Sequence, residues 1–296
     1  MSSKSLPQAI ASPSHQPLPL LRPMEVGELL DEAFDLYRKN FRLFFGIAVL
    51  VKVPVSLLVL LFPYNSPGMW AVEVAGFIVS LATWAALTRA AMDRLLNRET
   101  TIAAAYGHGL RRLFLVFTGL LLYALAGGVG LILFIVPGVF VLLWSLLFLP
   151  VAMLESRNWW NSFPLLRRTQ QLAAGQTWRL FFLALGLGLL GLIISGVLGA
   201  LVVLLGATGG LDLQHPPDLS SGTGVLLWAA YLLVSALANS AQAPVFTTAQ
   251  LLAYVDLRIR REAYDVELLA TAAEARAAAA RAPSLAVGPM PGQVGP

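Results

Sequence analysis

The sequence contains no cysteine, few charged residues and only three histidines, His15, His108 and His215. Without cysteine the chain has no disulfide and no thiolate metal site, and histidines scattered in this way predict no metal or cofactor. Charged residues make up 12% of the chain and apolar residues 57%, far from the balance of an ordinary soluble domain. The composition therefore predicts an integral membrane protein.

Six apolar runs each come close to the roughly 20 residues that a membrane-spanning helix needs. They cover Phe44–Phe62, Met69–Ala91, Leu113–Val136, Gly138–Leu154, Leu180–Gly206 and Gly224–Val245. We therefore expect an all-α fold with six transmembrane helices.

Basic residues gather in alternate gaps between these runs. The gaps around Pro63–Gly68, Pro137 and Ala207–Thr223 hold none, whereas the other gaps and the two ends hold nearly all of the 20 lysines and arginines. Short cytoplasmic loops carry such an excess, so we expect both termini in the cytosol and a multi-pass protein of a prokaryotic cytoplasmic (inner) membrane. The net charge of +4 then indicates binding to anionic lipid headgroups and not to nucleic acid. Each basic residue near the membrane surface contributes about 1 kcal/mol to that attraction.

The two ends of the chain differ from its middle. Residues 1–22 are rich in serine and proline and contain no apolar core, which predicts a disordered tail and no signal peptide. Residues 23–269 form the expected six-helix membrane domain. Residues 270–296 read as a cytosolic alanine-rich helix followed by a disordered tail.

A tripeptide repeats where three of the runs begin. Arg42-Leu43-Phe44, Arg112-Leu113-Phe114 and Arg179-Leu180-Phe181 are 70 and 67 residues apart. Each follows a stretch with one apolar helical stripe, at Val26–Tyr37, Ile102–Leu110 and Leu165–Ala173. We interpret the unit as an interfacial amphipathic helix followed by a membrane hairpin, so the fold is three such hairpins. Two alternatives stay open: any helix entering lipid favours arginine followed by aromatics, and the amphipathic helices could form a cytosolic cluster.

Two charges fall inside the apolar runs. Lys52 lies in the middle of the first, and Glu73 lies about one turn into the second. A charge at the centre of a membrane helix costs about 2.5–3.5 kcal/mol on insertion scales, so it suggests a function by default. We expect the two side chains to form an ion pair that closes the first hairpin, with a headgroup or ion site and independent snorkelling as alternatives.

The sixth run carries a polar stripe that includes Ser235, Asn239 and Gln242 and continues beyond Pro244 to Thr247 and Gln250. The favoured interpretation is hydrogen bonding to neighbouring helices, which is worth about 0.6 kcal/mol per bond. The alternative is a substrate site, because transporters bind at polar, broken helices near mid-depth. In the fifth run, Gly191, Ser195 and Gly199 predict a face of close helix packing.

Arginines also cluster near one membrane surface, where Arg157, Arg167 and Arg168 lie close to Glu155 and the pair Trp159-Trp160. Interfacial anchoring explains these residue types, and an anionic-lipid headgroup pocket is the alternative. Further along, Asp256 is placed to pair with Arg260 four residues on.

Segments at both ends and in the middle resemble a known family. The opening Leu21–Phe41, the closing Leu252–Asp265 and the middle segments Pro150–Glu155, Ser162–Arg168 and Gly175–Arg179 are similar to the prokaryotic glycerophosphoryl diester phosphodiesterase membrane-domain family. In some relatives this module is joined to a soluble phosphodiesterase domain whose histidines and carboxylates surround a divalent metal. No stretch of this sequence corresponds to that domain, so the resemblance implies a stand-alone membrane module.

No nucleophile–base or metal constellation can be assembled, so we expect no enzyme and no catalytic residue. The favoured function is a non-enzymatic membrane scaffold or lipid-interacting module with membrane lipids and membrane proteins as partners. The alternative is a small-molecule or lipid transporter or channel. The candidate polar or lipid contacts are Lys52, Glu73, Asn239, Gln242, Arg167 and Arg168. A water-lined cavity reached by Lys52, Asn239 and Gln242 would favour the transporter.

Overall fold

The computed structural model of the chain describes residues 23–63, 65–156, 162–209 and 222–264, with residues 266 and 270. In this part the regular elements are all helical. They are α1 (Val26–Lys39), α2 (Phe41–Leu58), the short 3₁₀ helix η1 (Val59–Leu61), α3 (Pro67–Leu95), α4 (Ile102–Arg111), α5 (Leu113–Leu133), α6 (Ile135–Ser145), α7 (Phe148–Leu154), α8 (Phe163–Ala173), α9 (Thr177–Gly209) and α10 (Gly222–Glu262). The predicted N-terminal tail, residues 271–296 of the predicted C-terminal segment and the Trp159-Trp160 pair lie outside the described residues.

Six helical segments are long and apolar enough to cross a membrane, which indicates a multi-pass membrane protein. They are Phe41–Leu61, Pro67–Leu95, Leu113–Leu133, Ile135–Leu154, Thr177–Val197 and Gly224–Glu262. Each contains or overlaps one of the six predicted runs, so the all-α class and the number of apolar helices are confirmed. Their arrangement as three membrane hairpins and the interfacial position of α1, α4 and α8 stay predictions.

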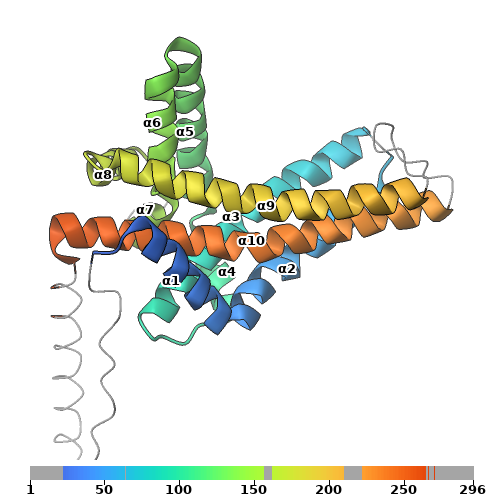
Figure 1. The fold of residues 1–296 in the computed structure, drawn as a ribbon, viewed down its shortest axis with the longest axis horizontal. Coiled ribbons are helices and arrows are strands. Elements are labelled where there is room, and N and C mark those ends of the chain that lie inside the picture. The colour runs from blue at the N-terminus through green and yellow to red at the C-terminus, as the bar shows by residue number, and fades with distance from the viewer. Residues whose placement is uncertain are drawn as a thin grey trace, which may run out of the picture.

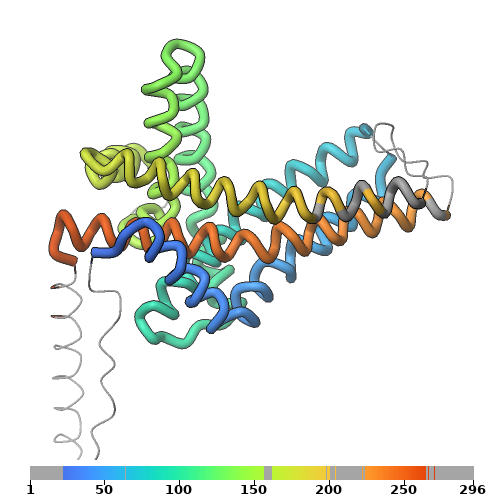
Figure 2. The backbone as a smooth tube through the Cα atoms, in the orientation of Figure 1, coloured from blue at the N-terminus to red at the C-terminus, as the bar shows by residue number. Residues whose placement is uncertain are grey.

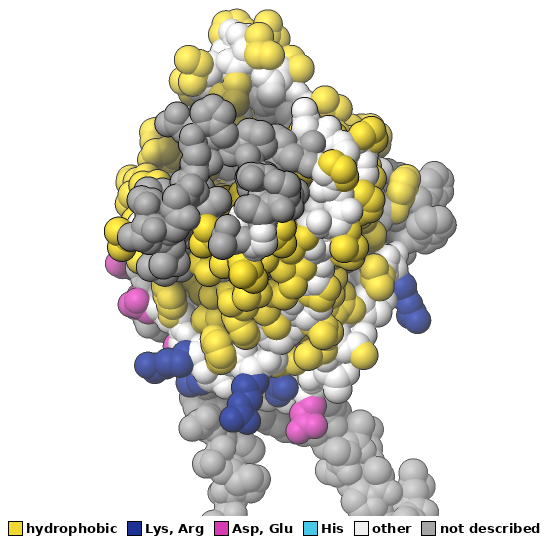
Figure 3. All heavy atoms as spheres, turned by 90° about the vertical axis from the view of Figure 1, so that its right-hand side faces the viewer, with side chains coloured by type: hydrophobic (Ala, Val, Ile, Leu, Met, Phe, Trp, Pro, Cys, Tyr) yellow, Lys and Arg dark blue, Asp and Glu magenta, His cyan; other side chains and the backbone are white. Residues whose placement is uncertain are grey.

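The helices form two arms that diverge from a shared base (Figures 1 and 2). One arm contains α2, α3, α9 and α10, in which α10 packs against the other three helices. The other arm is the antiparallel pair α5 and α6, which projects away from the first arm. At the base, α4 packs on α3, α1 packs on α10 and α9, and α8 packs on α7 and α10. Viewed from the far end of α9 and α10, the surface is mostly apolar, with charged side chains along its lower edge (Figure 3).

Helix α10 is much longer than its apolar pattern predicts. It contains 41 residues, about 60 Å of helix, whereas the apolar run ends at Val245. No helix-breaking residue follows Pro244 before Glu262, so the helix continues. Residues Leu251–Leu257 are buried, and the second half of α10 is therefore the central helix of the base.

The fourth predicted run is not one straight helix. Helix α6 ends at Ser145 and α7 begins at Phe148, because Pro150 has no N–H to donate to the carbonyl of Leu146. The residues Phe148–Met153 of α7 are all buried. Helix α7 thus belongs to the core of the base.

The core of the base depends on one close approach between α5 and α7. A Cβ atom on Gly119 of α5 would lie 1.9 Å from Cζ of Phe148, and Phe148 is completely buried. Only glycine leaves room for this ring at that position.

We expect Gly119→Ala to lower the free energy of unfolding by about 1–3 kcal/mol, because overpacking a full core displaces the ring. The matched control is Gly128→Ala on the same helix, where a Cβ meets nothing within 4 Å and alanine is the better helix former. Thermal unfolding in detergent measures both. Equal melting temperatures for the two variants would contradict the packing described.

The turn between α5 and α6 contains no polar side chain. Phe134 alone separates the two helices, and all residues from Ala124 to Leu143 are apolar or glycine. The turn closes tightly because a Cβ on Gly138 would lie 2.3 Å from the amide nitrogen of Leu131. Around it Ile132 is 85% exposed and Ile135 is 72% exposed. Such a tip is stable in hydrocarbon and unfavourable in water.

The cysteine-free chain allows a direct test of where this tip lies. In proteoliposomes opened to both sides, Phe134→Cys should react with a membrane-impermeant maleimide at least about tenfold more slowly than Pro63→Cys, because hydrocarbon suppresses the thiolate. Pro63 is an exposed residue of the turn between η1 and α3. Equal labelling rates would place the α5–α6 tip in water.

Candidate functional site

A pocket of about 300 Å³ lies between α2, α3 and α10, inside the apolar arm. Its polar lining is contributed by Lys52 of α2, by Ser80 and Thr83 of α3, and by Asn239, Ser240, Gln242, Thr247 and Gln250 of α10. Ala48, Trp84, Ala243 and Phe246 supply apolar walls. The pocket is partly open to the surroundings. Most of the lining is apolar, but a lysine and several neutral polar side chains meet in it between three apolar helices, which suggests a ligand.

Lys52 is the cation of this pocket. Its Nζ donates a hydrogen bond of 3.3 Å to Oγ of Ser80, whose own hydroxyl donates to the carbonyl of Gly76 at 2.8 Å. No carboxylate among the described residues lies within 4.0 Å of the Lys52 ammonium. The expected ion pair between Lys52 and Glu73 is therefore not formed, because Lys52 turns toward Ser80.

The polar stripe of α10 faces this cavity. Asn239 donates from Nδ2 to the carbonyl of Ser235 at 2.7 Å, and Thr247 donates to the carbonyl of Ala243 at 3.0 Å. These bonds stay within α10, and in the described part of the chain no side chain of the stripe bonds to another helix. The favoured interpretation of interhelical hydrogen bonding is wrong for this structure. Pro244, which is buried, also leaves the carbonyl of Ser240 without its ordinary helical donor.

Glycine in α9 makes room for one of the lining side chains. A Cβ on Gly191 would lie 2.4 Å from Nε2 of Gln242, so the Gln242 amide rests directly on the backbone of α9. The predicted small-residue face is otherwise not packed, since a Cβ on Gly188, Gly196 or Gly199 meets nothing within 4 Å. Gly191 therefore positions Gln242, and the rest of that face lies open.

The wall beside the pocket is fixed by Tyr106 of α4. Its hydroxyl donates to the carbonyl of Ile47 at 2.7 Å and lies 3.0 Å from Oγ1 of Thr83. The pKa of Tyr106 is raised, chiefly by burial, so the hydroxyl stays protonated and keeps this donor. Ser80, Thr83 and the hydrogen bonds of Tyr106 were not predicted from the sequence. Ser80 follows Glu73 by seven residues, which is two helical turns. This spacing could have indicated that the two side chains lie on the same face of α3.

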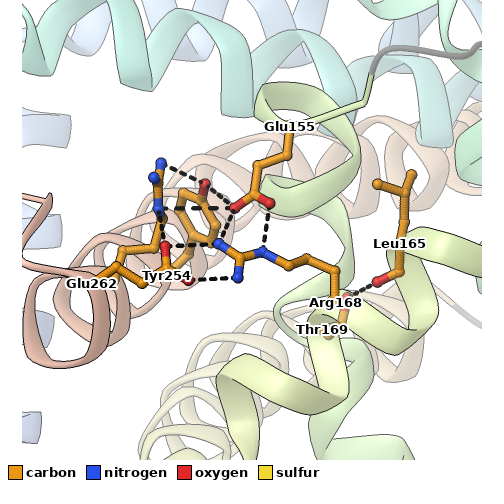
Figure 4. A network of polar contacts seen from close by, with 7 residues as sticks. Glu155, Leu165, Arg168, Thr169, Tyr254 and Glu262 are labelled. Atoms are coloured by element: carbon orange, nitrogen blue, oxygen red, sulfur yellow. Dashed lines mark hydrogen bonds and ion pairs between the residues drawn. The ribbon is translucent and has the colours of Figure 1, made fainter. Parts of the chain in front are cut away.

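A second polar cluster lies in the base and is fully satisfied (Figure 4). Arg168 of α8 donates from Nε to Glu155 at 2.7 Å and from Nη2 to Glu262 of α10 at 2.7 Å. The Tyr254 hydroxyl donates to Glu155 at 2.7 Å, and Arg258 donates to Glu262 at 2.9 Å. The pKa of Arg168 is raised, first by its hydrogen bond to Glu262 and then by Glu155. This cluster joins the end of α7 to α8 and α10.

Asp256 forms a third cluster that attaches the chain ahead of α1 to α9 and α10. Asp256 is completely buried. It accepts a hydrogen bond of 2.8 Å from the backbone N–H of Met24 and pairs with Arg179 of α9 at 3.0 Å. It also pairs with Arg260 at 3.1 Å, which confirms the predicted contact four residues apart. Arg179 and Arg260 both donate to the carbonyl of Met24.

Arg167 and Arg168 of the predicted arginine cluster have different surroundings. Arg168 is held by two carboxylates, which gives it a structural role, whereas Arg167 is exposed and has no ion pair or hydrogen bond with the described part of the chain. Arg157 lies outside the described residues. A headgroup pocket at these arginines stays a prediction, and the pocket at Lys52 is the better-formed candidate site.

Neither a candidate metal site in the described residues nor a similar protein indicates the function. The described residues contain no group of three or more histidine, cysteine, aspartate or glutamate side chains placed to hold a metal ion. No family model, no curated protein and no solved structure matches this chain. The family resemblance described above therefore stays an expectation.

We expect Arg168→Met to lower the free energy of unfolding by about 2–3 kcal/mol, because it leaves Glu155 and Glu262 without their shared cation. Arg167→Met is the matched control one residue away, and a surface substitution of this kind changes stability by no more than about 0.5 kcal/mol. Thermal unfolding of the purified proteins distinguishes the two. If the melting temperature of Arg168→Met equals that of the wild type, the cluster does not stabilise the base.

Proposed function

We propose that this protein binds the anionic group of a lipid or another amphiphile in the pocket between α2, α3 and α10. The observation that carries this proposal is Lys52, a cation within an apolar span whose only hydrogen-bond partner in the described residues is the neutral hydroxyl of Ser80. An unpaired ammonium at this depth costs about 2.5–3.5 kcal/mol. A phosphate or carboxylate in the pocket offsets this cost through a charge-assisted hydrogen bond.

The other lining groups support an anion with further polar atoms. The amides of Asn239 and Gln242 and the hydroxyls of Ser80 and Thr83 supply neutral polar groups in the same pocket as Lys52. Trp84 and Phe246 supply an apolar wall, and Trp84 is 41% exposed, so it lies at the boundary between the pocket and the lipid. An amphiphile matches this combination, because its polar group fills the cavity while its chain remains in hydrocarbon.

A polar cavity favours handling of a ligand over scaffolding alone, since a scaffold needs no such site. The proposal therefore ranks a lipid or small-molecule transporter, or a lipid-binding module, above a pure scaffold, and includes no enzymatic step. It places the protein in a prokaryotic cytoplasmic membrane with cytosolic termini, on the basis of the basic residues in alternate gaps. We also propose that the six helices form three membrane hairpins, each preceded by an interfacial helix. The resemblance to the glycerophosphoryl diester phosphodiesterase membrane-domain family is part of this proposal.

The test is native mass spectrometry of the full-length protein in detergent with added phosphatidylglycerol. We expect the wild type to retain one lipid per chain and Lys52→Met to bind it at least about tenfold more weakly, because a charge-assisted bond is lost while the apolar stem is kept. Asn239→Ala/Gln242→Ala should also weaken retention.

Arg167→Ala is the control, since it removes an exposed cation outside the pocket, and its retention should equal that of the wild type. Wild-type retention by Lys52→Met, together with a loss in Arg167→Ala, would refute the pocket and favour headgroup binding at the surface arginines.

A further inference from the structure

A second pocket adjoins the first and shares Lys52 and Ser80 with it. It has a volume of about 250 Å³ and continues along α2 and α3 toward the turn that joins them. Its lining includes Ser56 of α2, Glu73 and Gly76 of α3, and Leu232 of α10. Lys52 therefore stands where two cavities meet, with the polar stripe of α10 on one side and Glu73 on the other.

Lys52 and Glu73 carry opposite charges in one cavity and still do not pair. No N–O distance between them is within 4.0 Å, and Glu73 has no hydrogen bond or ion pair with the described part of the chain. The contact made by Lys52 explains this separation. Ser80 follows Glu73 by seven residues, which is two turns and about 10 Å along α3, and the Lys52 ammonium lies at the Ser80 end of that interval.

Two opposite charges held apart in a shared cavity match a molecule that itself carries both signs. A phosphate joined to an amine by a two-carbon spacer, with one hydrogen bond of about 2.8 Å at each end, is long enough to span the two helical turns between Ser80 and Glu73. The phosphate would meet Lys52 and the donors beside it, and the ammonium would meet Glu73. A purely anionic group would contact Lys52 only, and the exposed carboxylate of Glu73 would take no part in its recognition.

We propose that the ligand of the Lys52 pocket is zwitterionic, with its anionic group on Lys52 and its ammonium group on Glu73. This inference rests on the proposed function and deepens it, because it assigns Glu73 a second recognition role. The chemistry is shared by the headgroup of an aminophospholipid and by free phosphoethanolamine. The apolar wall formed by Trp84 and Phe246 favours the lipid.

The experiment presents the full-length protein with an equimolar mixture of phosphatidylethanolamine and phosphatidylglycerol and measures the bound ratio by native mass spectrometry. We expect the wild type to prefer phosphatidylethanolamine by about tenfold, the effect of one added charge-assisted contact. Glu73→Gln should bring the ratio close to one while total lipid retention persists. Glu99→Gln is the control, because Glu99 is an exposed carboxylate outside the pocket, and it should keep the wild-type ratio.

A further arm separates the two sources of the zwitterion. Phosphoethanolamine should displace bound phosphatidylethanolamine only in large excess if the acyl chains contribute, whereas displacement at equal concentration identifies the free compound as the ligand. In both cases inorganic phosphate and ethanolamine should be weaker competitors than phosphoethanolamine.

The results separate this inference from the proposed function. Equal retention of the two lipids by the wild type, or an unchanged preference in Glu73→Gln, overturns the zwitterionic ligand, and binding that still depends on Lys52 then leaves the anion site intact. Retention of both lipids by Lys52→Met at wild-type level overturns the site itself.

Discussion

A charge surrounded by hydrocarbon must find a partner, and the charged side chains of this protein meet that requirement in two different ways. Lys52 is the cation of the α2–α3–α10 pocket, and the protein offers it one hydroxyl, that of Ser80. The clusters of the base show the opposite situation. Arg168 is held by Glu155 and Glu262, and the buried Asp256 is held by Arg179, Arg260 and the backbone of Met24. These two clusters of the base are paired, whereas Lys52 and Glu73 in the spans have no ion pair with the described part of the chain.

This contrast assigns different roles to the two regions. The base is a packed structure in which α10 continues far beyond its apolar segment, and Leu251–Leu257 join the core together with α7. The two arms diverge from this base (Figure 1), and only the arm of α2, α3, α9 and α10 contains the pocket. A rigid base that holds α3 and α10 in register keeps the polar lining of the pocket assembled, as a binding site requires.

Much of the fold follows from the sequence, and the failures have physical causes. The six apolar helices are predictable because hydrocarbon demands long apolar segments with internal hydrogen bonding. The pairing of Asp256 with Arg260 is predictable because helical spacing determines it locally. The burial of the second half of α10 could not be predicted, because the sequence pattern does not distinguish a helix leaving a membrane from one buried in a protein core. The break before α7 was not predicted although Pro150 lies in that run, because Pro244 shows that a proline in an apolar run need not end a helix.

The candidate site was predictable in its residues but not in its geometry. Lys52, Asn239 and Gln242 were identifiable as polar groups inside apolar runs, and all three line the pocket. Their partners were assigned wrongly, since contact of Lys52 with Ser80 instead of Glu73 depends on how α2 and α3 are positioned. Tyr106 was recognised only as part of an apolar stripe, although its hydroxyl supports the wall of the pocket. The contribution of Gly191 required the position of Gln242 on the neighbouring helix.

The most direct test of the central claim is an experimental structure of the full-length protein in lipid nanodiscs, with density resolved around Lys52. The account predicts a bound polar group within hydrogen-bond distance of the Lys52 ammonium, enclosed by Ser80, Asn239 and Gln242. A Lys52 side chain paired directly with Glu73, beside a cavity closed by protein side chains, would contradict it.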